Sequence, residues 1–185
     1  MNTNEIYEKM HSGEVYTENQ ETLQEQAKYR DLLFQFNHTL PSKTQEKSLI
    51  LSKLLGSIGE NSYIEPPLHA NWGKNTYIGD GVYINFSLTL VDDTHVEIGD
   101  NTMIGPNVTI ITASHPIDPK ERLSHAQFNR PVMVGKNVWI GANVTIFPGV
   151  TIGENSVIGA GSIVTKDIPE NVLAFGTPCK IVKDI

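Results

Sequence analysis

The chain has 185 residues, a formal net charge of −7 and a single cysteine, Cys179. An acidic chain without runs of Lys and Arg is not expected to bind nucleic acid, and one cysteine excludes an intrachain disulfide. No apolar run approaches the roughly 18 residues of a membrane span, and residues 1–10 lack the features of a signal peptide, so we expect a cytoplasmic protein with no membrane partner.

Two helices are predicted in the first third of the chain. Apolar residues recur near one face over residues 18–37, as in an amphipathic helix. Ser42 and Gln45 have the spacing of a capping box, which predicts the start of a second helix. We therefore expect residues 1–60 to form a helical segment, and residues 61–72 to connect it to the rest of the chain.

Most of the following sequence, residues 61–185, obeys a six-residue repeat. β-Branched aliphatic residues occur at every sixth position of its last part: Val134, Ile140, Ile146, Ile152, Ile158 and Val164. The same spacing occurs upstream in two sets with a slip of two residues between them: Ile78, Ile84 and Leu90, then Ile98, Ile104 and Ile110. Each hexad can form one short strand with one inward aliphatic side chain, and three strands close one triangular coil. Because a hexad cannot bury its own apolar face, the coils must stack into a parallel β-helix.

The repeat is interrupted between Ile110 and Val134. This interval of 24 residues equals four hexads, so the register is kept on return. Residues 112–130 are polar and contain two prolines, which predicts a loop that projects from the β-helix at about 111–131. Residues 166–185 are expected to form a last coil and a tail that caps its exposed end.

Several polar residues stand where the repeat is disturbed. His115 begins the loop, and Pro116 restricts the backbone that presents its imidazole, so it is either a surface histidine or a catalytic base. Asp92 and Asp93 lie at the register slip, where they are turn residues or accept hydrogen bonds from ligand hydroxyls. Asn85, within a hexad, is either a turn residue or a donor towards developing negative charge.

Other residues suggest contacts to a ligand or a subunit. Trp139 offers a flat, rigid surface at an outward position for a neighbouring subunit, a ligand or both. Thr165, Lys166, Lys180 and Lys183 bring three cations to one end of an acidic chain. They are either scattered surface lysines or a site of attraction for a phosphorylated cofactor.

Several motifs resemble those of the hexapeptide-repeat acyltransferases: Ser114-His115-Pro116, Asn137-Val138-Trp139-Ile140-Gly141, Pro148 to Gly153, Ser156 to Ser162 and Val164 to Pro169. Within that family, the chain is similar to the galactoside and maltose O-acetyltransferases in two more motifs: Phe36-Asn37-His38-Thr39 and Val91-Asp92-Asp93. The resemblance covers almost the whole chain. It implies an all-β fold, a left-handed parallel β-helix, that forms a homotrimer with its active sites between subunits.

The resemblance also implies roles for individual residues. His115 corresponds to the general base, and Asn85 to a position that contacts either the oxyanion or the acceptor hydroxyl. Further acceptor contacts correspond to Glu18, Asn71 and Asp93. Coenzyme A contacts are expected from these residues: Trp139, Ala142, Ala160, Thr165, Lys166, Lys180 and Lys183. The implied reaction is acetyl transfer from acetyl-CoA to a hydroxyl of a maltose, glucose or galactoside-like sugar, without a metal.

The chain departs from the galactoside enzymes in both predicted subsites. Lys180 and Lys183 replace arginines, which keeps the charge but loses bidentate phosphate geometry, and Ala142 replaces a serine. Asn71 replaces a serine and Glu18 an aspartate in the acceptor subsite. Coenzyme A is still expected to bind, and the choice of sugar stays open.

Three other functions remain from the sequence. One is a zinc hydratase resembling the γ-class carbonic anhydrases, with His95, His115 and His125 as the histidines of the repeat region, although the paired histidines of that class are missing. Another is acetyl transfer to an amine or to the hydroxyl of an antibiotic. The last is a non-catalytic scaffold, which explains the hexads but not the combination of His115, Asn85 and Asp93.

Overall fold

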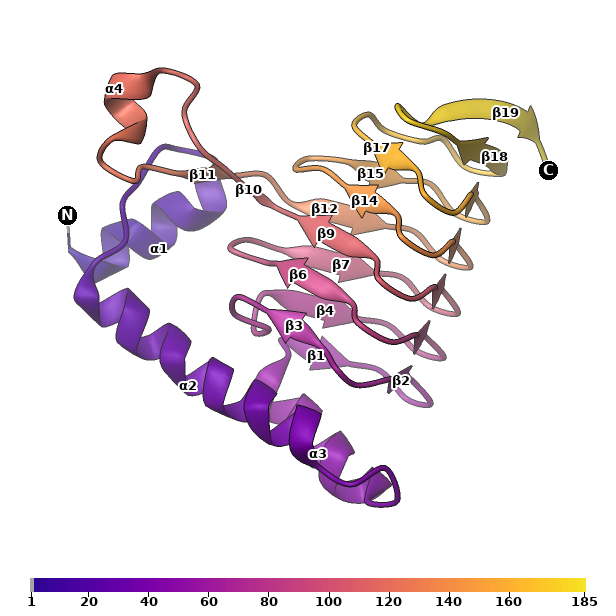
Figure 1. Ribbon diagram of the computed structural model, residues 1–185, viewed down its shortest axis with the longest axis horizontal. Helices are drawn as coiled ribbons and strands as arrows, with labels where there is room; N and C mark the ends of the chain where they lie inside the picture. Colours follow the sequence, from indigo (N-terminus) through magenta and orange to yellow (C-terminus); the bar gives the residue numbers. More distant parts are fainter. Residues whose placement is uncertain (1) are drawn as a thin grey trace.

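The computed structural model describes residues 2–185 and shows a three-sided parallel β-helix with helices at its N-terminal end (Figure 1). Three helices precede the β-helix, and a short fourth lies in the projecting loop: α1 (Thr3–Ser12), α2 (Gln20–His38), α3 (Thr44–Leu54) and α4 (Pro119–Arg122). No helix in residues 2–185 combines the length and apolar character that a membrane span requires. The cytoplasmic location stays a prediction.

Three sheets form the sides of the β-helix. The first sheet contains β1 (Ser57–Ile58), β4 (Thr76–Ile78), β7 (Val96–Ile98), β12 (Val132–Val134) and β15 (Thr151–Ile152). The second contains β2 (Tyr63–Ile64), β5 (Tyr83–Ile84), β8 (Met103–Ile104), β13 (Trp139–Ile140), β16 (Val157–Ile158), β18 (Val172–Phe175) and β19 (Lys180–Asp184). The third contains β3 (His69–Ala70), β6 (Thr89–Val91), β9 (Thr109–Ile111), β14 (Thr145–Ile146) and β17 (Ile163–Val164). Only the pairing of β18 with β19 is antiparallel within these sheets.

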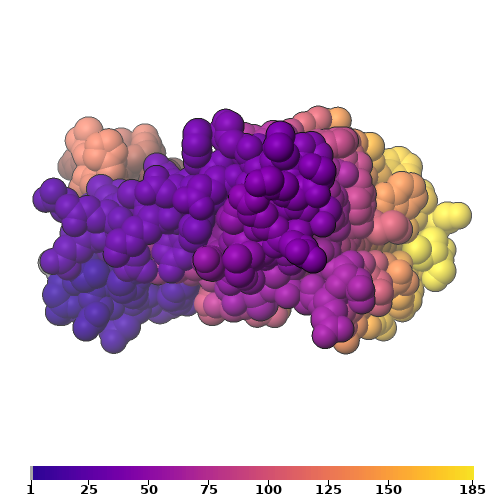
Figure 2. All heavy atoms as spheres, turned by 90° about the horizontal axis from the view of Figure 1, so that it is seen from below, coloured from indigo at the N-terminus to yellow at the C-terminus, as the bar shows by residue number. Residues whose placement is uncertain are grey.

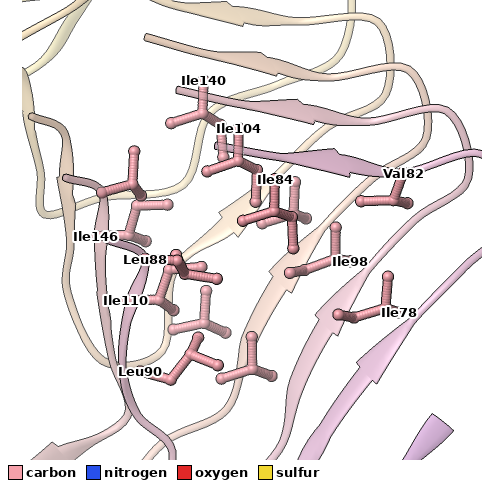
Figure 3. Close-up of a cluster of buried hydrophobic side chains, with 14 of the residues drawn as sticks. Ile78, Val82, Ile84, Leu88, Leu90, Ile98, Ile104, Ile110, Ile140 and Ile146 are labelled. Carbon is pink, nitrogen blue, oxygen red and sulfur yellow. The ribbon is translucent and has the colours of Figure 1, made fainter. Parts of the chain in front are cut away.

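The hexad residues form the core, as the repeat predicts. In the second sheet, Ile84 pairs with Ile104 and Ile104 with Ile140, and all three side chains point inward (Figure 3). Each hexad buries a second side chain two residues earlier, so the expectation of one inward residue per hexad was wrong. Aliphatic residues fill most of these additional positions: Val82, Leu88, Val108, Val138, Val144 and Val150.

The register slip reflects a longer corner after the third sheet. Ile78 pairs with Ile98, twenty residues later, whereas Val134 pairs with Ile152, eighteen residues later. The carboxylate of Asp92 is buried in this corner. It accepts hydrogen bonds from the backbone N–H groups of Trp72 and Gly73 at 2.9 and 2.7 Å, and from Thr76 Oγ1 at 3.0 Å. Asp92 therefore ties the longer corner to the coil before it.

Two expectations for the N-terminal part were wrong. Residues 61–72 are not a connector, because β2 and β3 in this range already belong to the first coil. The capping box of Ser42 and Gln45 does not form, since α3 begins at Thr44 without a side-chain cap. The helix expected over residues 18–37 is confirmed as α2. The predicted domain boundary at residue 60, between the N-terminal helical segment and the β-helix, stays a prediction.

Helix α1 was not predicted, although its capping signal is present in the sequence. Asn2 and Glu5 form a capping box, and Gly13 ends the helix in the left-handed conformation at φ 83°. Only Ile6 and Met10 of this short helix are buried, which leaves a weak apolar pattern.

The projecting loop is confirmed and is tied to the N-terminal segment. Strands β10 (Ala113–Ser114) and β11 (Phe128–Asn129) pair antiparallel, and α4 lies beyond them. Tyr16 and Gln127 exchange two backbone hydrogen bonds of 2.9 Å, and Asn129 Nδ2 donates to the carbonyl of Met10 at 2.9 Å. At the other end, β18 and β19 form the expected cap (Figure 1).

Candidate active site

The predicted site residues lie at two different corners of the β-helix. The corner between the third and first sheets, here the histidine corner, carries Asn71, Asp93, His115, Thr165 and Lys166. The corner between the second and third sheets, here the asparagine corner, carries Asn85, Ala142 and Ala160. One chain therefore does not bring His115 and Asn85 to the same corner.

A single hydrogen bond sets the tautomer of His115. Its Nδ1 lies 2.9 Å from the carbonyl oxygen of Ala126, across the base of the projecting loop. Because a carbonyl oxygen only accepts, Nδ1 carries a proton, and in the neutral ring the lone pair therefore lies on Nε2. The His115 side chain is exposed in the single chain, whereas Pro116 beside it is buried. The loop thus presents a fixed imidazole with a basic nitrogen available.

Asp93 is buried at the same corner with both carboxylate oxygens oriented. Trp72 Nε1 donates to Oδ1 and Asn71 Nδ2 donates to Oδ2, each at 3.1 Å. Burial raises the pKa of Asp93, although these bonds and the positive charge of Arg30 oppose the change. The sequence did not single out Trp72 or Arg30. Their roles depend on the stacking of one coil on the next.

Glu18 contributes a second carboxylate to this corner. It lies just before α2, and its Oε1 is buried without a hydrogen-bond partner among residues 2–185. Burial raises the pKa of Glu18, the negative charge of Asp93 raises it further, and Arg30 opposes both. A buried acceptor without a donor is costly, so Oε1 is suited to a donor from a ligand.

The asparagine corner borders a groove of about 490 Å³, lined by Asn85, Trp139, Ala142 and Ala160 among others. Asn85 Oδ1 accepts the backbone N–H of Phe86 at 2.8 Å, which leaves the Nδ2 donor for a ligand. The coils approach closely here. A Cβ on Gly141, a residue of the groove wall, would lie 2.6 Å from the backbone nitrogen of Ala160.

The predicted phosphate-binding residues are also divided. Thr165 and Lys166 follow β17 at the histidine corner, whereas Lys180 and Lys183 lie in β19 on the second sheet. All four are exposed. As for metals, no three His, Cys, Asp or Glu side chains within residues 2–185 come together as a metal site.

Two family models match this sequence. The hexapeptide repeat of succinyl-transferase matches residues 131–166, and the maltose acetyltransferase hexapeptide capping motif matches residues 9–59. The galactoside O-acetyltransferase of Lactococcus lactis subsp. lactis (strain IL1403) is 50% identical over 98% of this chain and 88% of its own. That of Escherichia coli (strain K12) is 45% identical over 96% of this chain and 88% of its own.

Solved structures agree with these sequence matches. A galactoside acetyltransferase in complex with coenzyme A matches with a TM-score of 0.94 and 42% identity, covering 100% of this chain and 92% of that chain. A maltose O-acetyltransferase from Clostridium difficile 630 matches with a TM-score of 0.95 and 43% identity, covering 97% of this chain and 96% of that chain. The left-handed β-helix and the acyltransferase predicted from the sequence are confirmed. The chain belongs to the hexapeptide-repeat acyltransferases, in the group of the galactoside and maltose O-acetyltransferases.

Proposed function

We propose that this enzyme transfers the acetyl group of acetyl-CoA to a sugar hydroxyl, with His115 as the general base. The hydrogen bond from Nδ1 to the Ala126 carbonyl carries this proposal, because it leaves Nε2 as the basic nitrogen. A neutral imidazole with a free lone pair on Nε2 can accept the proton of a hydroxyl while the hydroxyl oxygen forms its bond to carbon.

The carboxylates of the histidine corner favour an acceptor with several hydroxyl groups. Each Asp93 oxygen accepts one hydrogen bond from the protein and keeps a further lone pair, and Glu18 Oε1 has no partner among residues 2–185. These acceptors suit the adjacent O–H donors of a sugar such as maltose, glucose or a galactoside. An amine or an antibiotic hydroxyl would use fewer of them.

The groove at the asparagine corner is suited to acetyl-CoA. Its wall has no side chain larger than a methyl group at Ala142 and Ala160, so an extended thioester arm could lie against the coil backbone. Lys180 and Lys183, with Thr165 and Lys166, would attract its phosphates. Ala142 lacks a hydroxyl, so a donor to the arm must come from main-chain N–H groups.

We infer that the complete site forms between copies of the chain, most simply in a homotrimer. His115 and Asn85 lie at different corners of one chain, so a neighbour has to bring the second corner to the first. An apolar column along the second sheet supports such packing: Tyr63, Tyr83, Met103 and Trp139, which pair in register and are 38–54% exposed. Exposed apolar surface of this kind is typical of interfaces.

In the proposed reaction, His115 Nε2 removes the proton of the acceptor hydroxyl while its oxygen attacks the thioester carbonyl carbon. Asp93 orients the acceptor through its free lone pairs. Asn85 Nδ2 of a neighbouring copy donates to the carbonyl oxygen as negative charge develops there. The carbon–sulfur bond then breaks, and the sulfur of coenzyme A takes the proton from the imidazolium.

Thiol released from acetyl-CoA tests the acceptor class. The purified protein is assayed with maltose, glucose and galactosides, and in parallel with glucosamine and chloramphenicol. We expect release that depends on the neutral sugars and stays at the background rate without an acceptor. Faster thiol release with chloramphenicol or with glucosamine than with the neutral sugars would contradict a sugar O-acetyltransferase.

A further inference from the structure

A separate slot lies between α3 and the first coil, outside both corners of the candidate active site. Its volume is about 540 Å³, within the range of small-molecule sites. Its apolar wall includes Phe36, Leu51 and Ile64, all of them buried. Hydroxyl and amide groups complete the lining: Thr44, Gln45, Ser48, Ser52, Asn61 and Ser62. Figure 2 views the molecule from the side on which α2 and α3 cover this end of the β-helix.

Lys47 of α3 contributes a cation to the lining of this slot. The residue is only 3% exposed, and its Nζ lies 5.9 Å from the centroid of the Phe36 ring. Within residues 2–185, Lys47 forms no ion pair and its ammonium donates no hydrogen bond. Glu46 is paired with Lys43 at 3.0 Å, and Glu60 lies exposed on the lining.

The burial of Lys47 is not the usual arrangement of a surface lysine. Lysines commonly lay their methylene stem along apolar surface and keep the ammonium in water, which leaves the residue well exposed. Lys53, six residues further along α3, is exposed in this way. The Lys47 ammonium itself is not sealed off, because the fully buried side-chain polar atoms without a partner in residues 2–185 are Glu18 Oε1 and Asn129 Oδ1. It is therefore open to a ligand in the slot, and an anion there would supply the partner that the described residues do not.

We propose that the slot binds a small monoanionic carboxylate with an apolar body. The carboxylate would pair with Lys47, and the apolar body would lie against Phe36, Leu51 and Ile64. A monoanion fits better than a doubly charged phosphate, because the slot holds one cation and the carboxylate of Glu60 lies in its lining. The hydroxyl groups of Ser52 and Ser62 already donate to backbone carbonyls. The side chains of Thr44, Gln45, Ser48 and Asn61 donate no hydrogen bond within residues 2–185 and can donate to the carboxylate.

Calorimetric titration of the full chain with octanoate tests this site, with 1-octanol and inorganic phosphate as comparison probes. Lys47→Met removes the charge and keeps the stem, and Lys53→Met is the matched exposed control. We expect octanoate to bind the wild type and Lys53→Met alike, and at least tenfold more weakly to Lys47→Met. 1-Octanol should bind the wild type at least tenfold more weakly than octanoate.

Backbone amide shifts locate the binding, and Ser48→Trp, at an exposed residue of the lining, provides a second variant if Lys47→Met does not fold. Octanoate should shift the backbone amide signals of Ser48 and Ser62. The Ser48→Trp substitution should weaken octanoate binding. Equal octanoate affinity in the variants, shifts confined to the asparagine corner, tighter binding of phosphate, or no binding at all would each overturn the proposal.

Discussion

Single hydrogen bonds orient the polar side chains of the histidine corner. The Ala126 carbonyl fixes the His115 tautomer, and Trp72 and Asn71 fix the two oxygens of Asp93. Such bonds hold the reactive atoms in place before a ligand arrives, which is how an active site avoids reorganisation during the reaction.

Replacing His115 should remove catalysis without removing coenzyme A binding. Loss of a general base typically lowers the rate by about 10² to 10⁴, so kcat of His115→Ala should fall in this range while its affinity for coenzyme A stays unchanged. His125→Ala, in the same loop and exposed, is the matched control and should keep its activity. Steady-state thiol release gives kcat, and near wild-type turnover of His115→Ala would refute the base assignment.

The buried Asp92 should make stability depend on pH. Burial raises its pKa to about 7, although hydrogen bonds from Trp72, Thr76 and Gly73 oppose the change. The unfolded chain has the ordinary aspartate pKa of about 4, so the folded state binds the proton more tightly. The resulting stabilisation is complete below about pH 4 and is lost as the pH rises through 7.

Urea unfolding between pH 5 and 8, at one protein concentration, measures this effect. The free energy of unfolding of the wild type should decrease over this range by on the order of a few kcal/mol. Asp92→Asn should show a flatter dependence, with a smaller slope left from Glu18 and Asp93, whose pKa values are also raised. An unchanged slope in Asp92→Asn would assign the effect to other groups.

Sequence reasoning singled out His115, Asp93, Asn85 and Asn71 as candidates, but not Trp72 and Ala126, which also orient them. His115 begins a loop that breaks a regular repeat, which is visible in one sequence. Trp72 reaches Asp93 because the two residues lie above one another on successive coils. Ala126 reaches His115 because β10 pairs with β11 at the base of the loop. These contacts depend on three-dimensional register.

At the scale of elements, stability comes from ladders of inward aliphatic side chains. Each inner strand pairs with strands of the coils above and below, so each hexad residue packs within a continuous core rather than within its own strand. Removing one such side chain leaves a cavity that neighbouring coils cannot close without losing their backbone pairing.

Ile140→Ala tests this ladder against a matched substitution. Ile140 is 0% exposed, and its replacement by alanine should lower the free energy of unfolding by about 2–5 kcal/mol. Ile117→Ala removes the same atoms from a residue that is 93% exposed in the projecting loop, and should change stability by less than about 0.5 kcal/mol. Denaturant unfolding compares the two, and similar losses would contradict a core built from the hexads.

The first coil shows where the periodic signal fails. Ile58, Ile64 and Ala70 keep the six-residue spacing, but Ala70 is too small to mark an aliphatic position, and two adjacent prolines at 66 and 67 suggest a connector. The structure nevertheless stacks β3 on β6, with Ala70 opposite Leu90. Pairing with the next coil outweighs the local composition, which a single sequence does not reveal.

At the scale of the whole molecule, the candidate site residues are divided between two corners of the β-helix. His115, Asp93 and Glu18 gather at one corner, whereas Asn85 and the groove lie at another. The β-helix is a rigid three-sided body, so no bend of one chain is expected to bring the corners together. Three chains packed side by side could do so at every interface.

In the proposed trimer, His115 of one chain and Asn85 of a neighbouring chain act together. The most direct test mixes two inactive variants, His115→Ala and Asn85→Ala, by co-expression or by joint refolding, and measures acceptor-dependent thiol release. In a randomly mixed trimer about one quarter of the interfaces carry both intact residues, so about a quarter of wild-type activity should return. Activity no greater than the sum of the separate variants would contradict a site shared between chains.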